Sequence, residues 1–281
     1  MNISIIGSGT MGIGIAQVLI QSEDVVELNI IARSVENAEL VKAACLKYLT
    51  RLVRKGRISQ SYASNAIEKL IVGDSLELIQ SSNLVIEAVA EDFDIKLELF
   101  QKLIPYVMDG AIIASNTSSL SITAFANIFP KPENVVGLHF FNPAPIMELV
   151  EIVSGHVTCE EVINKLKVFT SNLGKSPVVV NEAPGFVVNR MLIPMINEAV
   201  SILAEGVATA DDIDKAMKFG AHHPMGPLAL ADLIGNDVNL SIMETLYKET
   251  GDPKYRAHPM LRKMVRANHL GRKTKKGFFE Y

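Results

Sequence analysis

The sequence predicts an α/β protein in two parts: an N-terminal, mostly parallel sheet joined by crossover helices, and a C-terminal part made only of helices. Short apolar runs alternate with helix-period segments over the first two thirds of the 281 residues, a pattern typical of strands joined by helices. Most of these runs lack polar alternation, as expected of strands that helices cover on both faces. After Pro184, only helical periods and helix breakers remain.

Each apolar run of the N-terminal part is interpreted as one strand of the sheet. The predicted strands are Ile3–Ile6, Val25–Ala32, Ile71–Val72, Leu84–Val89, Ala111–Ala114, Val135–Phe140, Leu149–Val153 and Val178–Val180. The change of character after the last strand places a domain boundary near Ala183. We therefore expect residues 1–183 and 184–281 to form separate domains.

The first helix of the C-terminal part is predicted to end at Gly206 and to bury one apolar face. That face is formed by Val188, Leu192, Met195 and Ala199. Because the C-terminal part is rich in Met and Ile, we expect its helices to pack against each other and against a second copy. The expected assembly is a homodimer or a higher homo-oligomer.

Capping and breaking residues mark the remaining helices. Thr209 is a suitable N-cap for a helix that stops at Gly220. Pro227 and Gly251 bracket further helical stretches, and Pro259–Leu270 is predicted as the last short helix.

The composition is that of a soluble globular protein. With 48% hydrophobic and 21% charged residues and a mean hydropathy of +0.24, the chain has too much apolar material to be disordered. A net charge of -4 and a pI of about 5.9 have the wrong sign for a protein whose main partner is a nucleic acid. Cys45 and Cys159 lack the spacing of a disulfide scaffold or a zinc site, which favours a reducing compartment.

The uncharged stretch Met1–Ser22 is not expected to be a signal peptide or a membrane span. It has no basic segment ahead of its apolar run, and glycines at positions 7, 9, 12 and 14 interrupt the apolar surface. The uncharged stretch Gly110–Pro130 is likewise broken by several polar residues. We therefore expect a cytoplasmic protein without a membrane partner.

A glycine-rich turn follows the first predicted strand and opens a helix. It consists of Gly7, Ser8, Gly9, Thr10, Met11 and Gly12. In such a turn the first glycine makes the tight bend, the second lets backbone approach a pyrophosphate, and the third lets helix pack on strand. The helix N-terminus offers N–H groups to the phosphates. The pattern predicts a Rossmann-type dinucleotide-binding site; the alternative is a glycine-rich turn without a ligand.

The cofactor predicted at this turn is NADP in preference to NAD. An NAD site usually has an acid about 20 residues beyond the glycines, where it accepts hydrogen bonds from the adenosine ribose. No acid lies between Leu28 and Val35, whereas Arg33 and Ser34 stand where a 2′-phosphate would lie. The alternative is that Arg33 is a solvated loop residue and that backbone or water holds the ribose.

Six further motifs follow in order along the chain. They are Ala114–Ser119, Gly137–Pro143, Ala183–Arg190, Asn197–Ala199, His223–Pro227 and the closing Gly271–Phe278. With the glycine turn, these motifs resemble the 3-hydroxyacyl-CoA dehydrogenase family over the full length of the chain, most of all its bacterial members that act on 3-hydroxybutyryl-CoA. The resemblance implies a two-domain enzyme that oxidises a short 3-hydroxyacyl-CoA with a nicotinamide cofactor.

His139 matches the catalytic histidine of this family, and Glu151 matches the carboxylate that orients it. Histidine can take a proton from an alcohol or return it, because the imidazole pKa lies near neutrality. The residues themselves favour the pairing, since an antiparallel turn centred at Pro145 sets position 139 opposite position 151. The alternative for His139 alone is a core histidine that bonds to backbone.

Further positions match family residues that contact substrate or cofactor. Ser118 and Asn189 match residues that hydrogen-bond the substrate oxygen; the alternatives are a helix N-cap for Ser118 and a solvated first-turn residue for Asn189. The positions that match cofactor contacts are Glu91, Lys96, Asn116 and Lys273.

The basic segment Arg51, Arg54, Lys55 and Arg57 is expected to bind the phosphates of coenzyme A. Lys55 matches a CoA-contacting lysine of the family. The alternative is a solvated helix face, which is the usual role of such a cluster. Family members commonly have Asn at the position of His222 and Gly at the positions of Lys275 and Ala231, and none of these departures removes a catalytic residue. The adjacent His222 and His223 do not form a metal site.

The leading hypothesis is an NAD(P)-dependent dehydrogenase acting on 3-hydroxybutyryl-CoA and acetoacetyl-CoA. A second hypothesis is a hydroxy-acid dehydrogenase of the hydroxyisobutyrate type. That class uses a catalytic lysine, and the helix after Gly185 has none before Lys215. A third hypothesis is a non-catalytic relative, as some lens crystallins are.

Overall fold

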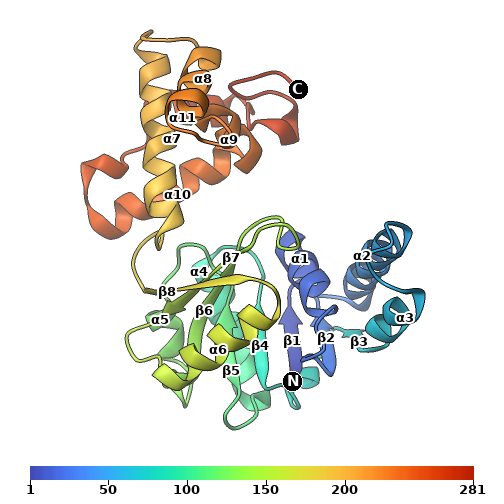
Figure 1. Cartoon of the computed structure of the whole chain (residues 1–281). Coiled ribbons are helices and arrows are strands. Elements are labelled where there is room, and N and C mark those ends of the chain that lie inside the picture. The colour runs from blue at the N-terminus through green and yellow to red at the C-terminus, as the bar shows by residue number, and fades with distance from the viewer. The chain divides into compact units, whose positions relative to one another are not determined.

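The eight predicted strands pair into one sheet (Figure 1). The computed structural model describes residues 1–281 and divides them into two compact units, Met1–Glu182 and Ala183–Tyr281. The strand order is β3-β2-β1-β4-β5-β6-β7-β8. Strands β1 to β6 run parallel, whereas β7 is antiparallel to β6 and parallel to β8. The prediction of a mostly parallel sheet is confirmed.

The strands keep close to the apolar runs that predicted them. They are β1 Asn2–Ile6, β2 Glu27–Ile31, β3 Leu70–Gly73, β4 Leu84–Glu87, β5 Ile112–Ser115, β6 Val135–Phe140, β7 Leu149–Ser154 and β8 Ser176–Asn181. Burial on both faces holds for the central strands but not for β8, where Val178 and Val179 are 44% and 42% exposed. As an edge strand, β8 has a neighbour on one side only.

Helices cover both faces of this sheet. The main core joins the sheet to α1, α2 and α6 on one face, and α4 and α5 pack on the other (Figure 1). On the second face, Phe100 and Phe125 meet edge to face with ring centroids 5.1 Å apart. The helices of this unit are α1 Thr10–Leu19, α2 Val35–Arg54, α3 Gln60–Glu68, α4 Phe93–Leu103, α5 Ile122–Ala126 and α6 Glu160–Asn172.

The second unit contains only helices and short turns, as the sequence predicts. Its helices are α7 Val188–Ala204, α8 Ala210–Gly220, α9 Pro227–Ile234, α10 Asn236–Thr250 and α11 Pro259–Arg266. The predicted cap of α8 is confirmed, because the Thr209 side chain accepts a hydrogen bond from the Asp212 N–H. No helix of either unit combines the length and the apolar character that crossing a membrane requires.

The buried face of α7 differs from the predicted one. Its buried residues are Ile193, Ile196, Ala199 and Val200. Leu192 and Met195, predicted as core, are only half-buried, while Met191 is 73% exposed. Because α7 is apolar on most of its circumference, periodicity alone does not indicate which stripe faces the core.

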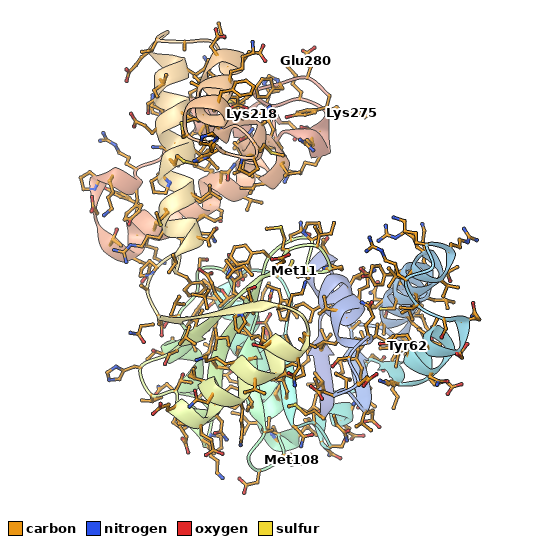
Figure 2. All side chains as sticks on the ribbon, viewed as in Figure 1. Met11, Tyr62, Met108, Lys218, Lys275 and Glu280 are labelled. Atoms are coloured by element: carbon orange, nitrogen blue, oxygen red, sulfur yellow. The ribbon has the colours of Figure 1, made fainter.

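The C-terminal segment folds around one buried carboxylate. Asp232, 1% exposed, accepts hydrogen bonds from the Phe278 and Phe279 N–H groups and from the Tyr281 hydroxyl. Lys275, labelled in Figure 2, lies in this segment with a φ of 59°. His222 has a φ of 55°. Both positions therefore have left-handed backbone, the conformation that Gly and Asn tolerate best.

The left-handed backbone predicts that Lys275→Gly stabilises the protein. Removing the Cβ relieves the strain, partly offset by the greater freedom of glycine in the unfolded chain, so the free energy of unfolding should rise by about 0.5–1 kcal/mol. Equilibrium urea unfolding measures the change. The control is Lys276→Gly, at a neighbouring residue without positive φ, which should lower stability. Equal destabilisation by both variants would contradict the argument.

Candidate active site

The glycine turn after β1 has the shape that a dinucleotide requires. Gly7 has a φ of +130°, and a Cβ there would lie 2.3 Å from the Ala88 carbonyl oxygen. A Cβ on Gly12 would lie 2.0 Å from the Gly7 carbonyl oxygen, so helix and strand pack through glycine alone. At Gly9 a Cβ would meet nothing within 4 Å, and no side chain caps the N-terminus of α1. Backbone N–H groups at this end can therefore meet a phosphate directly.

A cavity of about 690 Å³ lies at the carboxyl ends of β1, β2 and β4, beside the glycine turn. Its wall includes residues 7–11 of the turn, with Met11 at the start of α1 (Figure 2), and residues 88–90 after β4. Arg33 lines the cavity as well. Ser34 has a structural role, because its side chain accepts a hydrogen bond from the Asn37 N–H and so caps α2. Open space at Gly9 and a helix N-terminus in the same cavity fit a pyrophosphate-containing cofactor.

His139 and Glu151 form a buried hydrogen-bonded pair. Strands β6 and β7 pair with His139 directly opposite Glu151, which confirms the register that the turn at Pro145 predicts. His139 Nδ1 lies 2.8 Å from Glu151 Oε2, and the two side chains are 8% and 1% exposed. Because a carboxylate accepts hydrogen bonds, this contact favours the imidazole tautomer with its hydrogen on Nδ1.

This pair lies on the sheet face that α4 and α5 cover. The alternate residues Leu138, Phe140, Val150 and Ile152 belong to the core on the other face. Side chains alternate along a strand, so His139 and Glu151 point away from that core. The His139 ring also contacts the Phe141 ring, with centroids 4.4 Å apart.

The loop after β5 is bound to Glu91. Glu91 Oε1 lies 2.7 Å from Ser118 N, 3.1 Å from Ser118 Oγ and 2.6 Å from Thr117 Oγ1, all of which donate. The helix-cap alternative for Ser118 is wrong, because the side chain of Ser121 caps α5. Ser118 is thus held in a loop by backbone and side-chain bonds to one carboxylate.

Lys96 joins Glu91 to a second carboxylate that sequence reasoning missed. The Lys96 ammonium, 1% exposed, lies 2.5 Å from Glu87 Oε1 and 3.3 Å from Glu91 Oε2. Glu87 is fully buried at the end of β4 and also accepts hydrogen bonds from Val89 N and Ser115 Oγ. The signal that could have found it is a charged residue ending an otherwise apolar strand.

The charge state of Glu91 follows from these contacts. Burial alone would raise the pKa of Glu91, but the Lys96 ammonium and the hydrogen bonds from Thr117 and Ser118 together lower it below its ordinary value. Glu91 is therefore ionised at neutral pH and acts as an acceptor for the loop. Asn116 fixes the same edge, because its Oδ1 accepts a hydrogen bond of 2.9 Å from Phe140 N, next to His139.

The remaining predicted site residues belong to the end of α2 and to the helical unit. Arg51 and Arg54 occupy the last turn of α2, and Lys55 follows as its C-cap. These residues and Arg57 take part in none of the ion pairs of the structure. Asn189 and Lys273 belong to the helical unit: Asn189 lies in the first turn of α7, and the Lys273 ammonium lies 2.5 Å from Asp237. No three His, Cys, Asp or Glu side chains are grouped to hold a metal.

Comparisons with known proteins identify the family. Residues 2–183 match the 3-hydroxyacyl-CoA dehydrogenase NAD binding domain, and residues 185–281 match the C-terminal domain of the same family. A 3-hydroxybutyryl-CoA dehydrogenase of Clostridioides difficile is 48% identical over 281 residues, covering 100% of this chain and 99% of that protein. The human mitochondrial hydroxyacyl-coenzyme A dehydrogenase is 37% identical, covering 100% of this chain and 91% of that protein.

A solved structure gives the same result for the fold. The crystal structure of (S)-3-hydroxybutyryl-CoA dehydrogenase from Ralstonia eutropha superimposes with a TM-score of 0.95 at 40% identity, covering 100% of this chain and 98% of that one. Both family models together span nearly the whole chain, and the identities extend over its full length. This chain is therefore a member of the 3-hydroxyacyl-CoA dehydrogenase family.

Proposed function

We propose that this protein interconverts 3-hydroxybutyryl-CoA and acetoacetyl-CoA with NADP or NAD. The observation that carries the proposal is the buried His139–Glu151 pair, in the unit that also holds the glycine turn and its cavity. The relatives named above act on the same class of substrate.

In the proposed reaction, His139 moves the proton. When bound, the nicotinamide accepts a hydride from the alcohol carbon or returns it to the ketone carbon. During oxidation, Nε2 of His139 takes the hydroxyl proton while the C–H bond breaks and the C=O bond forms. Glu151 accepts the Nδ1 hydrogen bond throughout and stabilises the imidazolium that results. In the reverse direction, the imidazolium returns the proton to the forming alkoxide.

Ser118 and Asn189 are proposed to donate hydrogen bonds to the substrate oxygen. Neutral donors stabilise a developing alkoxide without consuming a proton. Support for Ser118 comes from its loop, which Glu91 holds through the Ser118 N–H. Glu91, Lys96, Asn116 and Lys273 are proposed as cofactor contacts, as in the family. Of these, Glu91 and Asn116 follow the carboxyl ends of β4 and β5, where open α/β sheets bind ligands, and the Lys96 ammonium reaches the same place from α4.

NADP is the proposed cofactor in preference to NAD. Arg33 lines the cavity beyond the carboxyl end of β2 and has no ionic partner, so its guanidinium is available to a 2′-phosphate. The phosphates of coenzyme A are proposed to meet Arg51, Arg54 and Lys55, which likewise form no ion pair.

The two units are proposed to bind different ligands, the cofactor and the substrate. Residues 1–183 form the dinucleotide-binding domain, and residues 184–281 form the substrate and dimerisation domain. Met191 at 73% and Phe219 at 74% exposure support burial of the helical unit against a second copy.

We propose that the enzyme is located in the cytoplasm. The hydroxyisobutyrate-type alternative loses support because α7 carries no lysine.

The proposed proton transfer predicts that His139→Ala lowers kcat by roughly 10²- to 10⁴-fold, the usual scale of acid-base assistance. Binding of NAD(P)H should change little, because the variant leaves the glycine turn intact. The test is acetoacetyl-CoA reduction followed by NAD(P)H absorbance, with His156→Ala, an exposed histidine, as the control. Wild-type turnover in His139→Ala would remove this residue from the mechanism.

Arg33→Asp is expected to shift cofactor preference toward NADH. Loss of a charge-assisted hydrogen bond to the 2′-phosphate changes the ratio of kcat/KM for NADPH and NADH by about 10- to 100-fold. Arg266→Asp makes the same charge change at an exposed position of α11 and should leave the ratio unchanged. An unaltered ratio in Arg33→Asp would exclude the proposed phosphate contact.

Lys55→Gln is expected to raise KM for acetoacetyl-CoA by about two- to fivefold, the scale of one exposed charge pair. The same variant should leave KM unchanged for the acetoacetyl thioester of N-acetylcysteamine, which lacks the nucleotide of coenzyme A. Lys167→Gln, which removes an exposed lysine from α6, serves as the control. A rise in KM for both thioesters would place Lys55 away from the CoA phosphates.

A further inference from the structure

Four charged residues line the cofactor cavity; two of them form an ion pair with each other, and two form no ion pair. The charged residues are Arg33, Asp74, Glu98 and Lys102. Glu98 and Lys102 lie on consecutive turns of α4, with Lys102 Nζ 2.5 Å from Glu98 Oε1, and so neutralise each other. Arg33 and Asp74 occur in no ion pair, and both are exposed. The cavity therefore offers a ligand one free cation and one free anion.

Asp74 occupies the place next to the end of β2. It follows Gly73, the last residue of β3, and Gly73 pairs with Ile31 in the parallel register of β2 and β3. Just beyond this pair, the Ala32 N–H donates a hydrogen bond of 3.0 Å to the Gly73 carbonyl oxygen. Asp74 thus stands beside Ala32 and Arg33, where the chain leaves the sheet at its carboxyl edge.

An acid is expected at this edge of a site that binds NAD. In most such sites, the carboxylate at the end of β2 accepts hydrogen bonds from the adenosine ribose hydroxyls. In this chain no carboxylate stands at the end of β2. The nearest acid on the following helix, Glu36, does not line the cavity; hydrogen bonds from its own backbone N–H and from Ser34 lower its pKa. The unpaired carboxylate that remains in the cavity is Asp74, directly after β3.

We propose that Asp74 accepts hydrogen bonds from the adenosine ribose hydroxyls and opposes Arg33 in the choice between NAD and NADP. A ribose with free hydroxyls gains a charge-assisted acceptor at Asp74. A 2′-phosphate is attracted by Arg33 and repelled by Asp74. The pair therefore sets the ratio of the two affinities, with Arg33 favouring NADP and Asp74 favouring NAD. This inference depends on the proposed function, because it takes the cavity as the adenosine site.

The experiment measures dissociation constants for NADH and NADPH with the full chain, by nicotinamide fluorescence and without acyl-CoA. In Asp74→Asn, NADH should bind about 10-fold more weakly, because a neutral amide oxygen replaces the charged acceptor. NADPH should bind about two- to fivefold more tightly, through loss of one exposed repulsion. Glu77→Gln removes an equal charge three residues further on, outside the cavity, and should change neither constant.

A cofactor analogue locates the contact. NADH with a 2′-deoxyadenosine ribose lacks one hydroxyl, so wild-type protein should bind it more weakly than NADH. Asp74→Ala should bind the two forms with nearly equal affinity, because its side chain has no acceptor.

Two results would overturn the inference. Equal weakening of NADH and NADPH in Asp74→Asn would place the carboxylate on a part common to both cofactors, such as the adenine amine. Unchanged constants would place it outside the site. Wild-type protein that binds neither cofactor would refute the proposed function as well, whereas binding with an unaltered ratio in Asp74→Asn refutes this inference alone.

Discussion

The register between β6 and β7 is the constraint on which the candidate site depends. Residues directly opposite each other in an antiparallel pair share a face, and a slip of one residue would send His139 and Glu151 to opposite faces. The loop between these strands is fixed from outside, because the Lys175 ammonium donates to the carbonyl oxygens of Ala144 and Met147 at 2.7 and 2.8 Å. Lys175 therefore fixes the loop that sets the register of the His139–Glu151 pair.

Buried charge is the second constraint on the carboxyl edge of the sheet. Glu87 is fully buried, and an isolated carboxylate there would be costly unless donors satisfied it. Lys96, Ser115 Oγ and Val89 N supply these donors, and Lys96 in turn reaches Glu91. One chain of contacts thus joins the end of β4 to the loop that carries Ser118. Breaking one member leaves a buried charge unpaired, so such networks hold their loops rigidly.

Local sequence patterns predict the strands and the pairing of β6 with β7. The features that they do not predict depend on contacts between segments far apart in the sequence. The apolar runs predict all eight strands, and two prolines between two runs predict the pairing of His139 with Glu151. A charged residue at the end of an apolar strand marks Glu87, but its partners lie on other elements of the chain and are not visible along that strand. Asp74 was not predicted because its place beside Arg33 depends on the pairing of β2 with β3. Periodicity did not predict the buried face of α7, because this helix has apolar residues on several of its faces. Periodicity and turn chemistry are local, whereas the partners of charged groups depend on strand order.

Strand order also separates the two proposed tasks of the N-terminal unit. The residues proposed to distinguish NAD from NADP lie at the ends of β2 and β3, where Arg33 and Asp74 are exposed. The residues proposed for proton transfer lie on β6 and β7, where Glu151 is 1% exposed. Charge changes at exposed positions cost little stability, whereas removing a buried partner is expensive. A chain built on this sheet can therefore change the charges beyond β2 and β3 while the buried pair on β6 and β7 keeps its register.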